Sequence, residues 1–159
     1  MDGDYRKALI AQIEKYYQEV VYPYKETTTS AMKDARKLNL FKKRDFGVHI
    51  RRFQEHMETA ADLDISDIES RISSEDVAGK LLADQFSRSR KTFLQLCEAN
   101  IEFYRVTDKK QHRGSGIVVK EFKAAAERMQ DALKAAVLEL DLLDKAYQKY
   151  AADKPAEKD

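Results

Sequence analysis

Apolar positions recur at helical spacing along the last third of the chain. Ten apolar or small residues follow one another at alternating steps of three and four between Val118 and Tyr150. An α-helix repeats every ~3.6 residues, so these positions form one stripe along a helix roughly 50 Å long. The stripe consists of Val118, Phe122, Ala125, Met129, Leu133, Ala136, Leu140, Leu143, Tyr147 and Tyr150. We expect this helix to be the one most cleanly built for burial.

The first half of the chain shows the same period with interruptions. Asp2 or Asp4 can cap a first helix with an apolar row of Leu9, Ile13, Tyr16, Val20 and Tyr24. Pro23 is expected to kink or end that helix, and the run 27–30 offers N-caps for a second one. From Ser30 to Leu63 the apolar phase slips between Phe41 and Phe46. This region is either one kinked helix or two helices joined at 42–45, and the kinked version is slightly favoured.

The second half begins with two capping signals. Ser66 and Glu69 have capping-box spacing and predict a short helix to Ile72, and the run 73–76 restarts the chain. A third long helix then carries the row Ala78, Leu82, Phe86, Phe93, Cys97, Ile101 and Tyr104. Within 87–91 only the small Ser89 can face inward. The polar segment 108–116, with two glycines, predicts the turn before the final helix.

These segments predict an all-α fold, because no strand-like alternation competes with the helical periods. The simplest assembly is an antiparallel up-and-down bundle of about four long helices with a short bridging helix. We expect one helical-bundle domain over residues 1–151, followed by a polar C-terminal tail at 152–159.

Composition narrows the class of protein. Of 159 residues, 36% are charged, with five Gly and two Pro, which is typical of long helices with solvated faces. The formal net charge of +1 argues against a dedicated nucleic-acid binder, although it allows a local patch. The single Cys97 suits a reducing compartment and a core position, and no apolar run reaches the length of a membrane span. The expectation is a soluble, cytoplasmic protein.

Charge is unevenly distributed along the chain. The stretch from Lys33 to Arg52 contains eight basic residues and only two acidic ones, and an acidic stretch follows from Glu55 to Asp76. A further basic group precedes Gly114 and Gly116, where a helix N-terminus could attract an anion. The anion or nucleic-acid patch predicted from these groups comprises Lys33, Arg36, Lys37, Lys42, Lys43, Arg44, Arg51, Arg52, Lys109, Lys110 and Arg113. The alternatives are solvated helix faces, or a bipolar surface that orients a partner.

Two histidines lie in the basic stretch. His49 and His56 are seven residues apart, whereas metal ligands on a helix favour spacings of three or four, so no metal or other cofactor is expected. Arg44 and His49, and likewise Arg51 and His56, share the spacing Arg-x4-His. This pattern is similar to the motif of the helical HEPN nucleases. The resemblance implies RNA cleavage, with histidine as acid or base and arginine on the phosphate.

Tyrosine is frequent near both ends of the domain, and its amphipathic ring suits either a core edge or a protein interface. The tyrosines that form the predicted protein-interaction face are Tyr5, Tyr16, Tyr17, Tyr22, Tyr24, Tyr147 and Tyr150. Since no catalytic constellation can be assembled from local sequence, we expect a non-enzymatic adaptor, scaffold or regulatory module that binds a protein partner. A homo-oligomer is also compatible. The rival hypothesis is a nucleic-acid or phosphate-binding helical protein, with or without HEPN-like cleavage.

Overall fold

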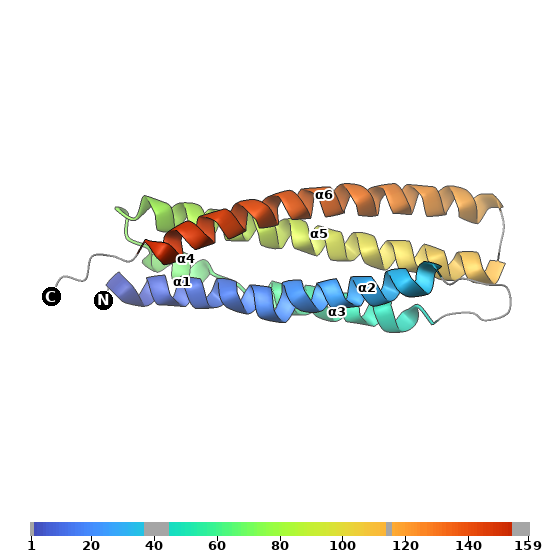
Figure 1. The fold of residues 1–159 in the computed structure, drawn as a ribbon, viewed down its shortest axis with the longest axis horizontal. Helices are drawn as coiled ribbons and strands as arrows, with labels where there is room; N and C mark the ends of the chain where they lie inside the picture. The colour runs from blue at the N-terminus through green and yellow to red at the C-terminus, as the bar shows by residue number, and fades with distance from the viewer. Residues whose placement is uncertain (1, 37–44, 114–115, 154–159) are drawn as a thin grey trace.

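The computed structural model describes residues 2–36, 45–113 and 116–153 (Figure 1). The described residues form helices and no strand, which confirms the all-α prediction. In chain order the elements are α1 (Asp2–Tyr16), the π-helix η1 (Tyr17–Val21), α2 (Tyr22–Arg36), α3 (Gly47–Asp62), α4 (Ser66–Arg71), α5 (Val77–Arg113) and α6 (Gly116–Ala152).

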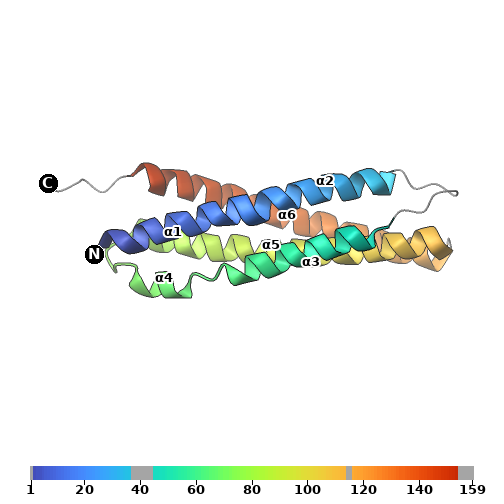
Figure 2. The same cartoon turned by 90° about the horizontal axis from the view of Figure 1, so that it is seen from below.

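The helices form an elongated antiparallel bundle, as predicted. The helices α1, η1 and α2 form one continuous rod, α3 and α4 return along it, and α5 and α6 add the remaining two rods (Figures 1 and 2). The start of α1 and the end of α6 share one end of the bundle. The end of α2, the start of α3, the end of α5 and the start of α6 lie at the other.

The first rod is longer than expected, because Pro23 does not end it. Proline lacks an N–H and its ring crowds the carbonyl four residues earlier. In η1, just before Pro23, the Tyr22 N–H donates to the Tyr17 carbonyl five residues back. We attribute the survival of the helix to this wider turn, which gives the proline ring room. The prediction that a new helix starts after Thr27–Ser30 is therefore wrong, since α2 runs on to Arg36.

The region from Ser30 to Leu63 is not one kinked helix. Asp45 and Phe46 lie outside any helix, and α3 begins only at Gly47, whose N–H donates to Asp45 Oδ1 at 2.9 Å. Phe46 is completely buried and its ring stacks on Tyr104, with centroids 5.8 Å apart. Burial of Phe46 at this position accounts for the slip in apolar phase. The expected junction at 42–45 lies, except for Asp45, outside the described residues.

The two capping signals before α5 had different outcomes. The short helix α4 is present, but Asp64 caps it: its Oδ1 accepts from the Ser66 N–H at 3.1 Å and from Ser66 Oγ at 2.8 Å. At the start of α5 the run 73–76 supplies a cap, and the residue that does so is Asp76, whose Oδ1 accepts from the Gly79 N–H at 2.9 Å. The carboxylate of Asp64 is a stronger hydrogen-bond acceptor for the first N–H of α4 than the hydroxyl of the capping-box residue Ser66 would be.

The polar segment 108–116 is mostly helix, not turn. The helix α5 continues to Arg113, and Gln111 Nε2 donates to Asp108 Oδ1 at 2.9 Å within its last turns. Lys and Gln are good helix formers, and both glycines of the segment come after Arg113. Between α5 and α6, only residues 114–115 lie outside the described ranges.

The core is centred on α5, not on α6 as the stripe suggested. Tyr104 of α5 stacks between Phe46 and Phe53, while Tyr16 meets Phe86 edge to face at 5.3 Å. Ser89 and Cys97 of α5 are buried, as predicted. On α6 the buried stripe residues are Ala125, Ala136, Leu143 and Tyr150. The helix α6 packs along α5 and covers less of its own apolar face than the pattern predicts.

Candidate protein-interaction groove

An apolar groove separates α6 from the first rod. Its walls are Val21 of η1 with Tyr24 of α2 on one side, and Leu133, Val137 and Leu140 of α6 on the other. Phe93 and Leu96 of α5 form its floor. This central part of the groove has a volume of about 180 Å³. It exists because α6 packs against α5 along its length, whereas its contacts with the first rod lie near the termini, at α1 and at the ring pair Tyr17–Tyr147.

The groove continues in both directions along the first rod. Toward the termini, a hollow of about 350 Å³ shares Val21 and Val137 with the central part and adds Tyr17 and Tyr22. Toward the other end, a hollow of about 540 Å³ shares Thr28 and follows α2 to Arg36, and its described lining comes from α2 alone. The three hollows together follow twenty residues of the first rod, or roughly 30 Å at the rise of a helix. We call this continuous feature the groove.

Large apolar side chains on the walls of the groove are exposed. Leu133 is 42% exposed, Val137 56%, and Tyr22 on the opposite wall 55%. Clustered exposed apolar side chains of this kind mark interaction surfaces more often than isolated ones do.

The opposite face of α6 has two matching side chains, Leu142 at 42% and Leu138 at 59% exposure, which do not line the groove. These two leucines provide matched controls for experiments on the groove.

The two ends of the groove differ in charge. Near the termini Asp141 and Asp144 line it from α6, and Lys145 pairs with Asp141 at 2.9 Å. At the other end Lys33 and Arg36 of α2 line it. The floor and walls between these ends are apolar apart from Lys25 and Thr28. A ligand in the groove would therefore meet two aspartates, with Lys25 beside them, at one end, and Lys33 and Arg36 at the other.

Two of the predicted interaction tyrosines and their neighbours instead hold the bundle together. Tyr5 and Tyr150 are both buried, and both hydroxyls donate to Asp76 Oδ2, at 2.8 and 2.6 Å. Arg6 donates to the carbonyls of Tyr150 and Asp153, and its guanidinium lies 4.0 Å from the centre of the Tyr150 ring. We call Tyr5, Arg6, Asp76 and Tyr150 the tyrosine latch, since it joins α1, α5 and α6.

The latch has a defined electrostatic balance. Partial burial alone would raise the pKa of Asp76, but hydrogen bonds from Tyr150, the Gly79 N–H and Tyr5 outweigh that effect and lower it. Burial and the adjacent Asp76 carboxylate raise the pKa of Tyr150. At neutral pH the latch therefore pairs the neutral Tyr150 phenol with an ionised Asp76 carboxylate.

The other predicted tyrosines divide between core and groove. Tyr16 and Tyr24 are buried, and Tyr24 accepts a hydrogen bond from Asn100 Nδ2 at 2.9 Å. Tyr17 and Tyr22 line the groove. Tyr147 packs edge to face on Tyr17 and donates to Glu14 Oε1 at 2.7 Å; burial and Glu14 raise its pKa to about 12. The sequence could not separate these roles, because all of these rings have helical spacing.

The predicted basic patch is only partly described. Lys33, Arg36, Arg51, Arg52 and Lys109 are exposed. Lys110 is half-buried, with its ammonium 4.2 Å from the centre of the Phe122 ring. Arg113 is the last residue of α5. Lys37, Lys42, Lys43 and Arg44 lie outside the described residues.

Both histidines of the Arg-x4-His pattern are buried between α2 and α3. His49 Nε2 lies 2.7 Å from Asp34 Oδ2, and His56 Nε2 lies 2.8 Å from Thr27 Oγ1. Burial lowers the pKa of His56. Arg51 and Arg52 are exposed, so the described residues do not bring an arginine and a histidine together on one accessible surface.

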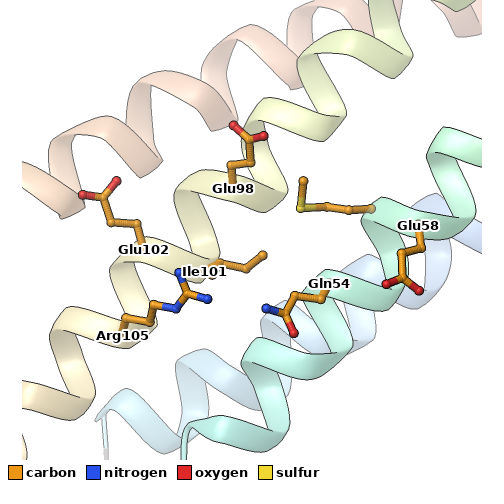
Figure 3. A pocket seen from close by; sticks show the side chains of 7 residues that line it. Gln54, Glu58, Glu98, Ile101, Glu102 and Arg105 are labelled. Carbon is orange, nitrogen blue, oxygen red and sulfur yellow. The ribbon is translucent and has the colours of Figure 1, made fainter.

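A second surface hollow lies between α3 and α5 (Figure 3). It measures about 600 Å³, and Gln54, Glu58, Glu98, Glu102 and Arg105 line it with Met57 and Ile101. In Figure 3 the Glu98 and Glu102 carboxylates point to the same side of α5 and the Glu58 carboxylate points elsewhere, while Glu102 pairs with Arg128 of α6 at 2.5 Å. Within the described ranges no three His, Cys, Asp or Glu residues are placed to hold a metal ion. The three carboxylates of this hollow do not converge on one point.

Comparison with family models, with curated protein sequences and with solved structures gives no match. None of the helices in the described ranges combines the length and the apolar character that crossing a membrane requires.

Proposed function

We propose that the protein is a non-enzymatic interaction module that binds an amphipathic helix of a partner protein in the groove. The observation that supports this most directly is the exposure of Leu133 and Val137. Both lie on or beside the helical stripe of α6, and both face a groove with an aromatic and aliphatic floor. A further helix would cover these side chains and complete the packing around α5.

The dimensions of the groove suit a helix. A helix is about 10–12 Å across and rises 1.5 Å per residue, so roughly 20 residues would follow the groove from Tyr17 to Arg36. Helix-in-groove recognition uses apolar anchors at i, i+3, i+4 and i+7. Such anchors would contact Val21, Leu133 and Val137 in the central part, where the groove is apolar.

The charges at the two ends predict the polarity of the partner. Acidic residues on the bound helix would lie beside Lys33 and Arg36, and basic residues beside Asp141 and Asp144. Complementary charge of this kind orients a partner and speeds association more than it raises affinity. The buried Cys97 is compatible with action in the cytoplasm, which is where we place the module.

The test uses a displayed library of 20-residue amphipathic helices selected against the full chain. Affinities of the selected peptides are measured by fluorescence anisotropy for three proteins: the native chain, Leu133→Ser/Val137→Ser, and the matched control Leu142→Ser/Leu138→Ser. We expect the groove variant to bind at least about tenfold more weakly, since tenfold corresponds to about 1.4 kcal/mol, and the control to bind like the native chain.

Two results would overturn the proposal. One is selected peptides that bind the groove variant and the native chain equally well. The other is self-association, seen by light scattering, that disappears in the groove variant while the matched control still associates. That second result would identify a second copy of this chain as the occupant of the groove.

A further inference from the structure

Cationic side chains from all four rods meet at the end of the bundle remote from the chain termini. They are Lys33, Arg36, Arg51, Arg52, Lys109 and Lys120. Each lies within five residues of an end of α2, α3, α5 or α6. Five residues correspond to about 8 Å along a helix. These helix ends share one end of the bundle in both views (Figures 1 and 2). We call this group the basic end.

The tertiary contacts confirm that these segments lie side by side. Asp34 of α2 reaches His49 of α3 at 2.7 Å, which brings the last turn of α2 to the first turns of α3. Phe103 of α5 meets Phe122 of α6 at 5.3 Å. Tyr104 of α5 stacks on Phe46 just before α3. Basic residues distant in sequence are therefore neighbours in space.

The positive charge of the basic end is not neutralised by the described residues. All six side chains are exposed, and none forms an ion pair within 4.0 Å in the described part of the chain. Three of the nearby acids have other partners: Asp34 bonds His49, Asp45 caps the Gly47 N–H, and Asp108 accepts from Gln111. Glu55 and Glu121 are exposed and, within the described ranges, form no ion pair with these six side chains within 4.0 Å. Uncompensated charge of one sign attracts a polyanion.

We propose that the basic end binds the phosphate backbone of nucleic acid without reading its sequence. Two helices side by side are about 20 Å wide, which equals roughly six base-pair steps of a duplex. Contact with the backbone is favoured over stacking on bases, because no large aromatic side chain is exposed at this end within the described ranges. Among the side chains that are described at this end, a set that leaves out 112–118, Val119 is the only large apolar one that is exposed. A membrane surface fits less well, since interfacial docking buries several apolar side chains.

This surface overlaps the groove only in part, so four of its six cations stay accessible when a helix occupies the groove. Only Lys33 and Arg36 contribute to both features. The substitution Leu133→Ser/Val137→Ser should therefore leave nucleic-acid binding unchanged, which makes failure of one proposal distinguishable from failure of the other.

The test measures anisotropy of a labelled 20-base-pair DNA duplex, and of an RNA duplex of the same length, over a range of salt concentrations. Contact with six phosphates predicts a slope of log affinity against log salt of about −5 on DNA. The variant Arg36→Glu/Arg52→Glu/Lys109→Glu should lose at least about tenfold in affinity at low salt. All three residues are exposed, so thermal melting should remain near that of the native chain.

The matched control reverses three exposed lysines at or near the opposite end, Lys7→Glu/Lys80→Glu/Lys149→Glu, and so has the same net charge as the first variant. We expect it to retain most of the native affinity. Equal losses in both variants would attribute binding to net charge alone and overturn the proposal. Absence of binding at low salt would also overturn it, as would binding to phosphatidylserine vesicles without binding to either duplex.

Discussion

Near its C-terminus α6 is fastened to α1 and to the start of α5, whereas its middle faces the open groove. Tyr150 at the fastened end is 2% exposed and bonds Asp76, while Val137 in the middle is 56% exposed. Both belong to one helix with a regular apolar pattern. The burial of each apolar side chain of α6 therefore depends on which element lies opposite that turn of the helix.

The difference has a structural consequence for the groove. The latch joins three rods at one end, and α5 supports α6 along its length. An apolar groove between helices would normally close by side-chain repacking or by helix movement. We infer that the latch and the α5 contact hold α6 at a distance from α2, so that the groove stays open for a partner.

The largest effect should come from removing the ring at the fastened end. Tyr150→Ala deletes a buried aromatic ring and leaves Arg6 without its ring contact, so the free energy of unfolding should fall by about 3 kcal/mol. Urea denaturation followed by circular dichroism measures it. The control is Tyr22→Ala, an exposed tyrosine on the groove wall, which should change stability by under about 0.5 kcal/mol. Equal losses in the two variants would contradict the comparison.

A smaller loss is expected for Gly79→Ala. In an ordinary helix this change stabilises by up to about 1 kcal/mol. Here the new Cβ would lie 2.4 Å from Asp76 Oδ2 and 3.0 Å from the Tyr150 hydroxyl, so the latch must shift. We expect a net loss of about 2 kcal/mol in the same urea assay, a typical cost of overpacking. A net gain in stability would show that the latch tolerates the methyl group.

The latch should also produce a pH dependence at the acidic end of the range. The folded-state pKa of Asp76 is lowered below the ordinary value of 3.8. Its contribution to stability is therefore fully present above that value and is lost as pH falls through the folded-state pKa. Comparing urea midpoints between pH 5 and pH 2 should show a shallower decline for Asp76→Asn than for the native chain. Parallel curves would mean that another carboxyl group is responsible.

The smallest effect is predicted for the open face. Leu133→Ser/Val137→Ser should change the free energy of unfolding by less than about 1 kcal/mol, because the two residues are already 42% and 56% exposed. Leu143→Ala, a fully buried residue of the same helix, should cost about 3 kcal/mol. If the groove variant were as destabilised as Leu143→Ala, the groove would be part of the core and not a binding surface.

The accuracy of the sequence predictions depended on whether local or distant groups decide each feature. The Asp76 cap and the inward position of Ser89 were predictable, because spacing within one helix decides them. The continuation through Pro23 was not, since the π-turn at η1 is a backbone adjustment with no composition signal. The burial of His49 and His56 depends on Asp34 and Thr27, which lie on a different helix.

The candidate sites likewise combine features that the sequence shows with features that depend on the tertiary structure. The basic residues were identified from composition alone, but their meeting at one end requires the antiparallel order of four rods. The groove had no sequence signal, because Leu133 has the same spacing as the buried Leu143. The latch was visible only as three unrelated features: an N-cap, an N-terminal tyrosine and a C-terminal one.

The sequence by itself determined the helical class, the number of long rods and the uneven charge, because hydrophobic period and charge are properties of neighbouring residues. Only the tertiary structure decided which rod is central and which turns of α6 are covered. An apolar stripe predicts that a helix packs against other parts of the protein, but it does not specify which neighbouring helix covers each turn. Contacts such as Tyr150 with Asp76 join residues more than seventy positions apart, and these contacts determine where α6 is held and where it remains open.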